Sequence, residues 1–202
     1  DILQIKNKRS QAKQNKTKNM FIEKLGFVTN STFTLRGSSG EIKKLWQENF
    51  IGKWLRNHNG EIRIPFVTGY WSNEMRNHNL VVDAGKAVVA GLINGVVTNF
   101  FDYVAIGTGT VAAAAGDTTL GTEITTGGGA RALATLSRVT TDVTNDTARF
   151  VLTYTFTATF AVTESGVFDA AAAGGMLARQ TFSAINVVSG DSLEVTWNAD
   201  VD

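Results

Sequence analysis

The stretch RFVLTYTFTATF, residues 149–160, alternates between apolar and polar side chains along its whole length. In an extended chain, one face would carry its larger apolar side chains, which are Phe150, Leu152, Tyr154, Phe156, Ala158 and Phe160. The opposite face would carry Val151 and the threonines between them. Strict alternation is typical of a strand with one side in the core and one in solvent. The stretch therefore predicts a half-buried β-strand.

Runs of similar composition, rich in Val, Thr and aromatic residues, cover residues 101–109, 130–143, 161–170, 175–188 and 191–201. Turn-forming residues separate them, such as Asn145-Asp146, Gly174-Gly175 and Ser189-Gly190-Asp191. Short strands with turns at this spacing predict a mainly β protein, with a jelly-roll-like antiparallel β-sandwich over residues 98–202. Residues 107–130, made mostly of small side chains, form a loop long enough to be a contact surface.

Residues 21–97 predict a connector and attachment region of short extended pieces and two helices. The first helix is expected over 41–57, because Ser38 and Glu41 have capping-box spacing and apolar residues from Ile42 to Leu55 follow helical periodicity. The second is expected over 79–95, with Asn79 as its cap and Asn94-Gly95 as its stop. Pro65, the only proline, suits an edge strand or a connecting segment.

The first twenty residues form a basic arm with too little apolar surface to fold alone. Its cations are Lys6, Lys8, Arg9, Lys13, Lys16 and Lys18. Three readings stay open: a solvated tail, an arm that orders against an acidic protein neighbour, and an arm that contacts nucleic acid. Nucleic acid is the less favoured partner, and without aromatic residues such contacts would go to phosphates.

Charged residues are distributed unevenly along the 202-residue chain. Residues 1–86 hold 15 Lys or Arg and 7 Asp or Glu, a net charge of +8, whereas residues 87–202 hold 4 Arg and 11 acids, a net of −7. The two parts therefore face different surroundings, or neutralise one another between neighbouring copies.

Residues capable of catalysis are scarce and scattered. The chain has no cysteine, which excludes disulfides and thiolate metal sites, and its histidines, His58 and His78, lie apart from any acidic cluster with ligand spacing. Gly107-Thr108-Gly109-Thr110 lacks the lysine of a phosphate loop, and Glu164-Ser165-Gly166 lacks a nucleophile elbow. No apolar run is long enough to span a membrane or act as a secretory signal. We expect no enzyme, no metal and no cofactor.

Three stretches, residues 103–132, 137–150 and 161–197, together resemble a domain common in tailed-bacteriophage virion proteins, which are often of tail-fibre type. The alanine-rich GTGT loop, VTESGVF and FSAINVVSGDSL are the most specific parts of the likeness. Residues 42–55, 64–71 and 79–95 are similar to the connector of such proteins, so the likeness covers roughly residues 40–202. The resemblance implies assembly into a particle, and it supplies no catalytic residue.

We therefore expect a non-enzymatic structural component of the virion that attaches to capsid, neck or tail subunits and forms homo-oligomers. Attachment to the tail or fibre is favoured slightly over head decoration. The expected apolar anchors are aromatic residues of the connector, namely Trp46, Phe50, Trp54, Tyr70 and Trp71. Two tryptophans on one helical stripe also fit a core. The alternative function is a receptor- or carbohydrate-binding module of a tail fibre.

Overall fold

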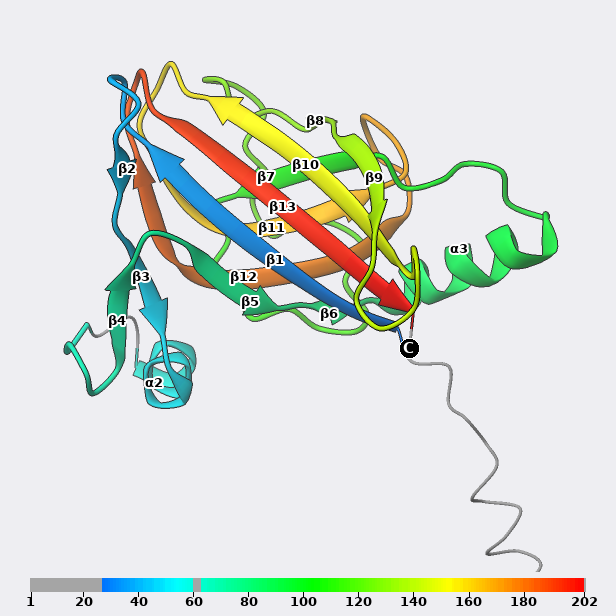
Figure 1. The fold of residues 1–202 in the computed structure, drawn as a ribbon, viewed down its shortest axis with the longest axis horizontal. Coiled ribbons are helices and arrows are strands. Elements are labelled where there is room, and N and C mark those ends of the chain that lie inside the picture. The colour runs from blue at the N-terminus through cyan, green and yellow to red at the C-terminus, as the bar shows by residue number, and fades with distance from the viewer. Residues whose placement is uncertain (1–26, 60–62, 202) are drawn as a thin grey trace, which may run out of the picture.

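The structure is a computed structural model that describes residues 27–59 and 63–201. These residues form an antiparallel β-sandwich with two helices (Figure 1), which confirms the predicted mainly β class. The predicted basic arm, residues 1–20, lies outside the described residues.

The first sheet has the strand order β2-β1-β13-β10-β9, with β5 paired to β1 beside β2. Its strands are β1 (Phe27–Arg36), β2 (Ile42–Lys43), β5 (Met75–His78), β9 (Thr135–Val139), β10 (Thr147–Thr155) and β13 (Ser192–Val201). The central strand β13 pairs with β1 over ten residues and with β10 over nine. Blue β1 and red β13 therefore lie side by side (Figure 1).

The second sheet has the strand order β6-β12-β11-β7-β8. Its strands are β6 (Leu80–Val81), β7 (Tyr103–Gly107), β8 (Ala132–Leu133), β11 (Phe160–Phe168) and β12 (Met176–Val187). Most of β11 and β12 is buried on both faces, because α3 and the 108–131 loop cover the side away from the core. The chain passes from this sheet to the first at Ala134, whose N–H donates to the carbonyl of Asp102.

The core lies between the two sheets and contains aromatic side chains from both. Phe33 of β1 packs on Phe182 of β12, with ring centroids 4.4 Å apart. Two of the buried aromatics, Trp197 and Tyr154, have partners for their polar atoms, as burial favours. The Trp197 indole donates to the Ser165 hydroxyl at 3.1 Å, and the Tyr154 hydroxyl donates to the Val104 carbonyl at 2.8 Å.

The stretch 149–160 is two strands rather than one. β10 ends at Thr155, and β11 begins at Phe160 after a bend. The predicted faces are right, because Phe150, Tyr154 and Phe156 are buried. Past Phe156 the backbone leaves the β13 ladder, because the Thr157 N–H donates to the Gly127 carbonyl at 3.0 Å.

The sandwich also draws on the segment expected to be connector. The predicted domain begins at residue 98, yet β1 supplies a full-length neighbour of β13. Asn30, Thr32 and Thr34 face outward there, in alternation with buried Ser31, Phe33 and Leu35. The sandwich therefore uses residues on both sides of the expected boundary.

The first predicted helix is correct only in its second half. α2 spans Phe50–Asn59, whereas residues 42–48 form β2 and β3 (Leu45–Glu48), which pairs with β4 (Gly69–Ser72). The cap is Asn49, whose side-chain oxygen accepts the Gly52 N–H at 2.9 Å. Burial of both Leu45 and Trp46 in a strand outweighs the helical periodicity of this segment.

The second predicted helix exists, but it starts later than expected. α3 spans Asp83–Asn94 and ends at Gly95, which has a left-handed φ of 74°, as the predicted stop requires. Asn79 is not its cap, because its side chain accepts a hydrogen bond from Ser31 at 2.9 Å and its N–H donates to Thr29.

Candidate functional site

A lobe projects from one end of the sandwich (Figure 1), and we name it the aromatic lobe because its residues include all five predicted anchors. It consists of β3, α2 and β4, covering residues 45–59 and 63–72. Phe66 is 94% exposed and Phe50 is 84% exposed, while Trp54, Tyr70 and Trp71 are each about half exposed. Large apolar side chains at this exposure and in one place mark contact surfaces more often than free surface.

Phe66 is exposed on a strained backbone. Its φ of 64° lies in the left-handed region, which is unfavourable for a bulky side chain. A short turn holds it there, with the Phe66 N–H donating to the Gly69 carbonyl at 2.8 Å and Val67 N–H donating to Ile64 at 3.0 Å. The fold therefore keeps the Phe66 ring exposed, although the left-handed backbone at this residue costs free energy.

Trp46 does not belong with the exposed anchors, although it was predicted among them. It is 1% exposed, because β3 lies against β12 and the Trp46 carbonyl accepts the Ser183 hydroxyl at 2.9 Å. Its ring meets the edge of Trp71, with centroids 5.4 Å apart. Trp46 therefore supports Trp71 from inside and cannot itself touch a partner.

The lobe is fastened to the sandwich. Arg56 of α2 donates to the Thr181 carbonyl of β12 at 3.4 Å, and it is held in place by an ion pair with Glu48 of β3 at 2.9 Å. Arg63 donates to the Ala184 carbonyl of β12 at 3.0 Å, and its guanidinium lies 5.5 Å from the Trp71 ring centre. The exposed rings are therefore presented by a rigid support, which lowers the entropy lost on binding.

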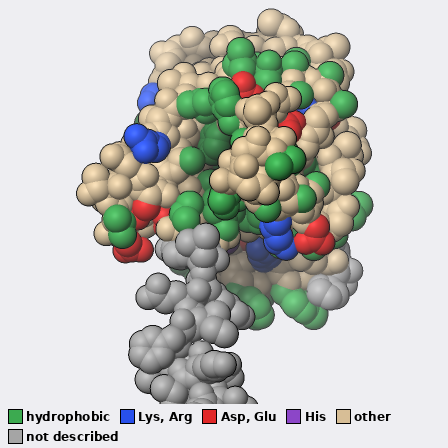
Figure 2. Space-filling view, turned by 90° about the vertical axis from the view of Figure 1, so that its right-hand side faces the viewer, with side chains coloured by type: hydrophobic (Ala, Val, Ile, Leu, Met, Phe, Trp, Pro, Cys, Tyr) green, Lys and Arg blue, Asp and Glu red, His purple; other side chains and the backbone are tan. Residues whose placement is uncertain are grey.

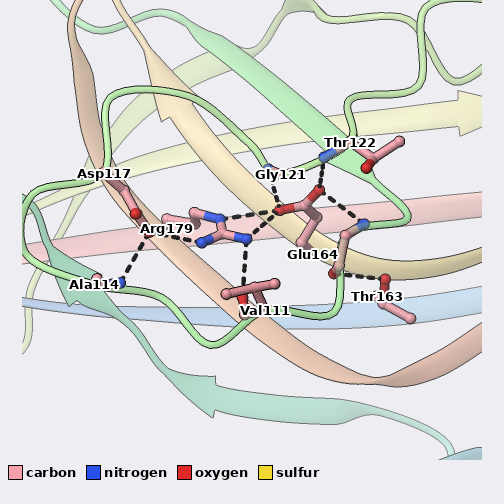
Figure 3. A network of polar contacts seen from close by, with 9 residues as sticks. Val111, Ala114, Asp117, Gly121, Thr122, Thr163, Glu164 and Arg179 are labelled. Carbon is pink, nitrogen blue, oxygen red and sulfur yellow. Dashed lines mark hydrogen bonds and ion pairs between the residues drawn. The ribbon is translucent and has the colours of Figure 1, made fainter.

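A buried carboxylate, Glu164 of β11, organises the 108–131 loop (Figure 3). Glu164 is fully buried and accepts the N–H groups of Gly109, Gly121 and Thr122 at 2.7–2.9 Å. Arg179 of β12 binds the same carboxylate through two nitrogens, at 3.0 and 2.7 Å. We name these residues the Glu164 clamp.

The other end of Arg179 also holds the loop. It pairs with Asp117 at 2.6 Å and donates to the Val111 carbonyl at 3.0 Å. Burial alone would lower the pKa of Arg179, but the bonds to Asp117 and Glu164 outweigh it and raise that pKa. For Asp117, burial acts to raise the pKa, and the bonds from Ala114 N–H and Arg179 outweigh it and lower it.

The clamp is structural, since its charged groups already bind one another and the loop. Ser165, next to Glu164, is fully buried and donates to the Ala105 carbonyl at 2.9 Å, so it cannot reach a substrate. The clamp therefore fixes a long loop of small residues against the second sheet.

A polar hollow of about 420 Å³ lies on the outer face of the first sheet. Its floor is one row of paired residues from four strands: His78, Asn30, Asn198 and Arg149. Arg149 Nε donates to Asn198 at 3.0 Å, and Asn198 Nδ2 donates to Asn30 at 3.2 Å. Arg76 and Thr32 form part of the rim.

Sequence reasoning missed this hollow. Of its residues only His78 drew attention, as an isolated surface histidine. The outward alternation of Asn30 and Thr32 was a usable signal for an exposed polar face, but the row forms only through strand pairing between residues 48 and 168 positions apart. No local motif carries that information.

An apolar surface lies beside α3, where hydrophobic side chains gather on the face seen in Figure 2. It contains a second hollow of about 420 Å³ between α3, residues 100–101 and strands β9 and β10. Phe100 is 58% exposed and Leu136 of β9 is 43% exposed. Within the described chain, β9 pairs only with β10, so its other edge is open.

The described residues contain no group of three or more His, Asp or Glu placed to hold a metal ion. None of their helices combines the length and apolarity needed to cross a membrane. The predicted arm residues Lys6, Lys8, Arg9, Lys13, Lys16 and Lys18 lie outside the described part of the chain.

Comparison with family models, with curated proteins and with solved structures finds no match. The function must therefore be argued from these surfaces and from the sequence.

Proposed function

We propose that this protein is a non-enzymatic structural component of a bacteriophage virion, which docks on a neighbouring subunit through its aromatic lobe. The observation that carries the proposal is the near-complete exposure of Phe50 and Phe66 on a lobe that is hydrogen-bonded to β12 of the sandwich. The virion context comes from the sequence resemblance. Attachment to the tail or fibre is the preferred position, ahead of head decoration.

The lobe has the composition of an interface centre. Aromatic residues dominate the energies of protein contacts, and burying one phenylalanine contributes about 1.5–3 kcal/mol. The exposed Lys53 of α2 adds a cation to the rim. The partner surface is therefore apolar in its centre and acidic at its edge, and the basic arm would add ionic contacts that are weak singly.

Incorporation into particles tests this function. Phages carrying Phe50→Ser with Phe66→Ser in this chain should contain much less of it after purification, as measured by quantitative mass spectrometry. Val111→Ser is the matched control, because Val111 is 75% exposed on the clamped loop and away from the lobe. Circular dichroism of each purified chain checks folding.

Two results would contradict the proposal. If the wild-type chain is absent from purified particles, the proposed virion role is wrong. If the double variant is incorporated as fully as the wild type, the virion role stands, but the aromatic lobe is not the docking surface.

We also propose that copies of the chain associate through the apolar surface beside α3. Two copies could pair their open β9 edges in antiparallel fashion, since a two-fold axis places the same strand on both sides. The contact would cover Leu136 and Phe100 together with the edge.

A further inference from the structure

We propose that the polar hollow on the outer face of the first sheet binds an anionic saccharide. This function is separate from docking through the aromatic lobe and uses none of the lobe's residues. The sequence analysis gave carbohydrate binding as the alternative function, and this hollow would be the site of that binding.

Several hydrogen-bond donors of the row have no acceptor among the described residues. Arg149 donates only through its Nε, to Asn198, and its two terminal nitrogens have no acceptor there. The Asn30 side-chain oxygen accepts from Asn198, and the Asn30 amide N–H groups likewise have no acceptor in residues 27–59 and 63–201. Donors fixed in place but unpaired at the floor of a hollow favour a ligand rich in acceptors.

The hollow also carries positive charge. Arg149 lies at one end of the row, and Arg76 lies on the rim. A planar guanidinium binds a carboxylate or phosphate through two parallel hydrogen bonds. Arg76 contacts Glu74 at 3.0 Å, but both side chains are well exposed, so this ion pair is weak and a ligand can compete with it.

The nearest acid along β13 does not cancel this charge. Asp200, one row further along, is 8% exposed and accepts the Thr147 hydroxyl at 2.9 Å. Its carboxylate is thus engaged beneath the surface. The hollow therefore presents cations and amides to the ligand.

The row of residues also has the length of a short oligosaccharide. Four neighbouring strands at about 4.8 Å spacing place His78 and Arg149 about 14 Å apart at their Cα atoms, which suits a short oligosaccharide lying across the strands. No Phe, Tyr or Trp side chain lines the hollow, so a neutral sugar would lack the stacking platform it prefers. The amides of Asn30 and Asn198 suit sugar hydroxyls, which both donate and accept.

The test uses the full chain and two probes, trigalacturonate and its carboxyl-reduced, neutral counterpart, in isothermal titration calorimetry. We expect the acidic trisaccharide to bind and the neutral one to bind at least tenfold more weakly. Arg149→Gln should weaken binding at least tenfold. Arg76→Gln, a change at an exposed side chain that leaves the floor intact, should weaken it severalfold.

The matched control is Arg36→Gln, an exposed arginine on the same face of β1 but three rows away. It should leave binding within twofold of wild type. An equal loss in Arg36→Gln would show that net charge alone attracts the probe, which overturns the proposal.

Two other outcomes also overturn it: no binding of trigalacturonate at millimolar concentration, and displacement of the trisaccharide by an equal concentration of inorganic phosphate, which would identify a simple anion site. Incorporation of the chain into particles is measured separately, so failure of this inference and failure of the docking function are distinguishable.

Discussion

Glu164 is the residue whose replacement tests the clamp most directly. In Glu164→Gln the amide cannot balance the charge of Arg179, and its NH2 group would face the backbone N–H donors of the loop. Breaking a buried ion pair costs about 3–5 kcal/mol, and we expect a loss near the lower end because Asp117 still pairs with Arg179. Denaturant titration measures the free energy of unfolding.

Glu194→Gln provides the control for this change, because Glu194 is exposed on the outer face of β13. The free energy of unfolding of Glu194→Gln should differ from that of the wild type by less than about 0.5 kcal/mol. Equal stability of Glu164→Gln and wild type would show that the clamp does not stabilise the fold.

Acid should weaken the fold through two aspartates. The pKa of Asp146 is lowered well below its usual 3.8 by N–H bonds from Val143, Thr141 and Asp142, and the pKa of Asp117 is lowered as described above. A carboxylate with a depressed folded-state pKa stabilises the protein above its unfolded pKa and loses that effect as the pH falls. Asp102 acts in the opposite direction, because burial and Asp169 raise its pKa.

The melting temperature should therefore fall between about pH 4 and about pH 2, as followed by circular dichroism. Asp146→Asn, which removes one titrating group, should show a smaller fall over the same interval. A fall of the same size in both proteins would mean that Asp146 does not contribute to acid sensitivity.

At the level of elements, α3 is positioned by a close approach to β12. A Cβ at Gly85 would lie 2.3 Å from the Leu177 carbonyl oxygen and 2.7 Å from its Cα, and these backbone atoms cannot move aside easily. Gly85→Ala should therefore destabilise the protein by about 1–3 kcal/mol, although alanine is the better helix former. Thermal unfolding measures the effect.

Gly116→Ala is the matched change, since a Cβ there meets nothing within 4 Å. It should be neutral or slightly stabilising. If Gly85→Ala is equally well tolerated, α3 is free to shift away from β12.

Residue composition and turn signals correctly predicted strands from residue 101 onward. Alternation contributed at β10, which is half-buried, but not at β11 and β12, most of which is buried on both faces. Residues 41–57 carry a good helical pattern, yet Leu45 and Trp46 enter a strand because β4 and β12 offer partners that no local window contains. The exposure of Phe50 and the burial of Trp46 could not be predicted from the sequence either, since both depend on that packing.

For the whole molecule, the open β9 edge predicts self-association. The wild-type chain should form concentration-dependent dimers in size-exclusion chromatography with light scattering. Leu136→Lys should be monomeric, because a charged side chain on an edge strand opposes pairing.

Val28→Lys is the control, since Val28 of β1 is similarly exposed, at 43%, but lies on another part of the sheet. Its dimers should persist. If the wild-type chain stays monomeric at every concentration, the proposed interface at the β9 edge is wrong.

The pairing of β1 with β13 has a consequence for synthesis on the ribosome. Arg36 pairs with Ser192, 156 positions later, so β1 emerges roughly ten to thirty seconds before its partner at ordinary translation rates. During that interval the edge of β1 that later pairs with β13 has no partner, and an unpaired strand edge is a hazard for misassembly. The sandwich can therefore close only after β13 has been synthesised, and a host chaperone that shields β1 until then should raise the yield of folded chain.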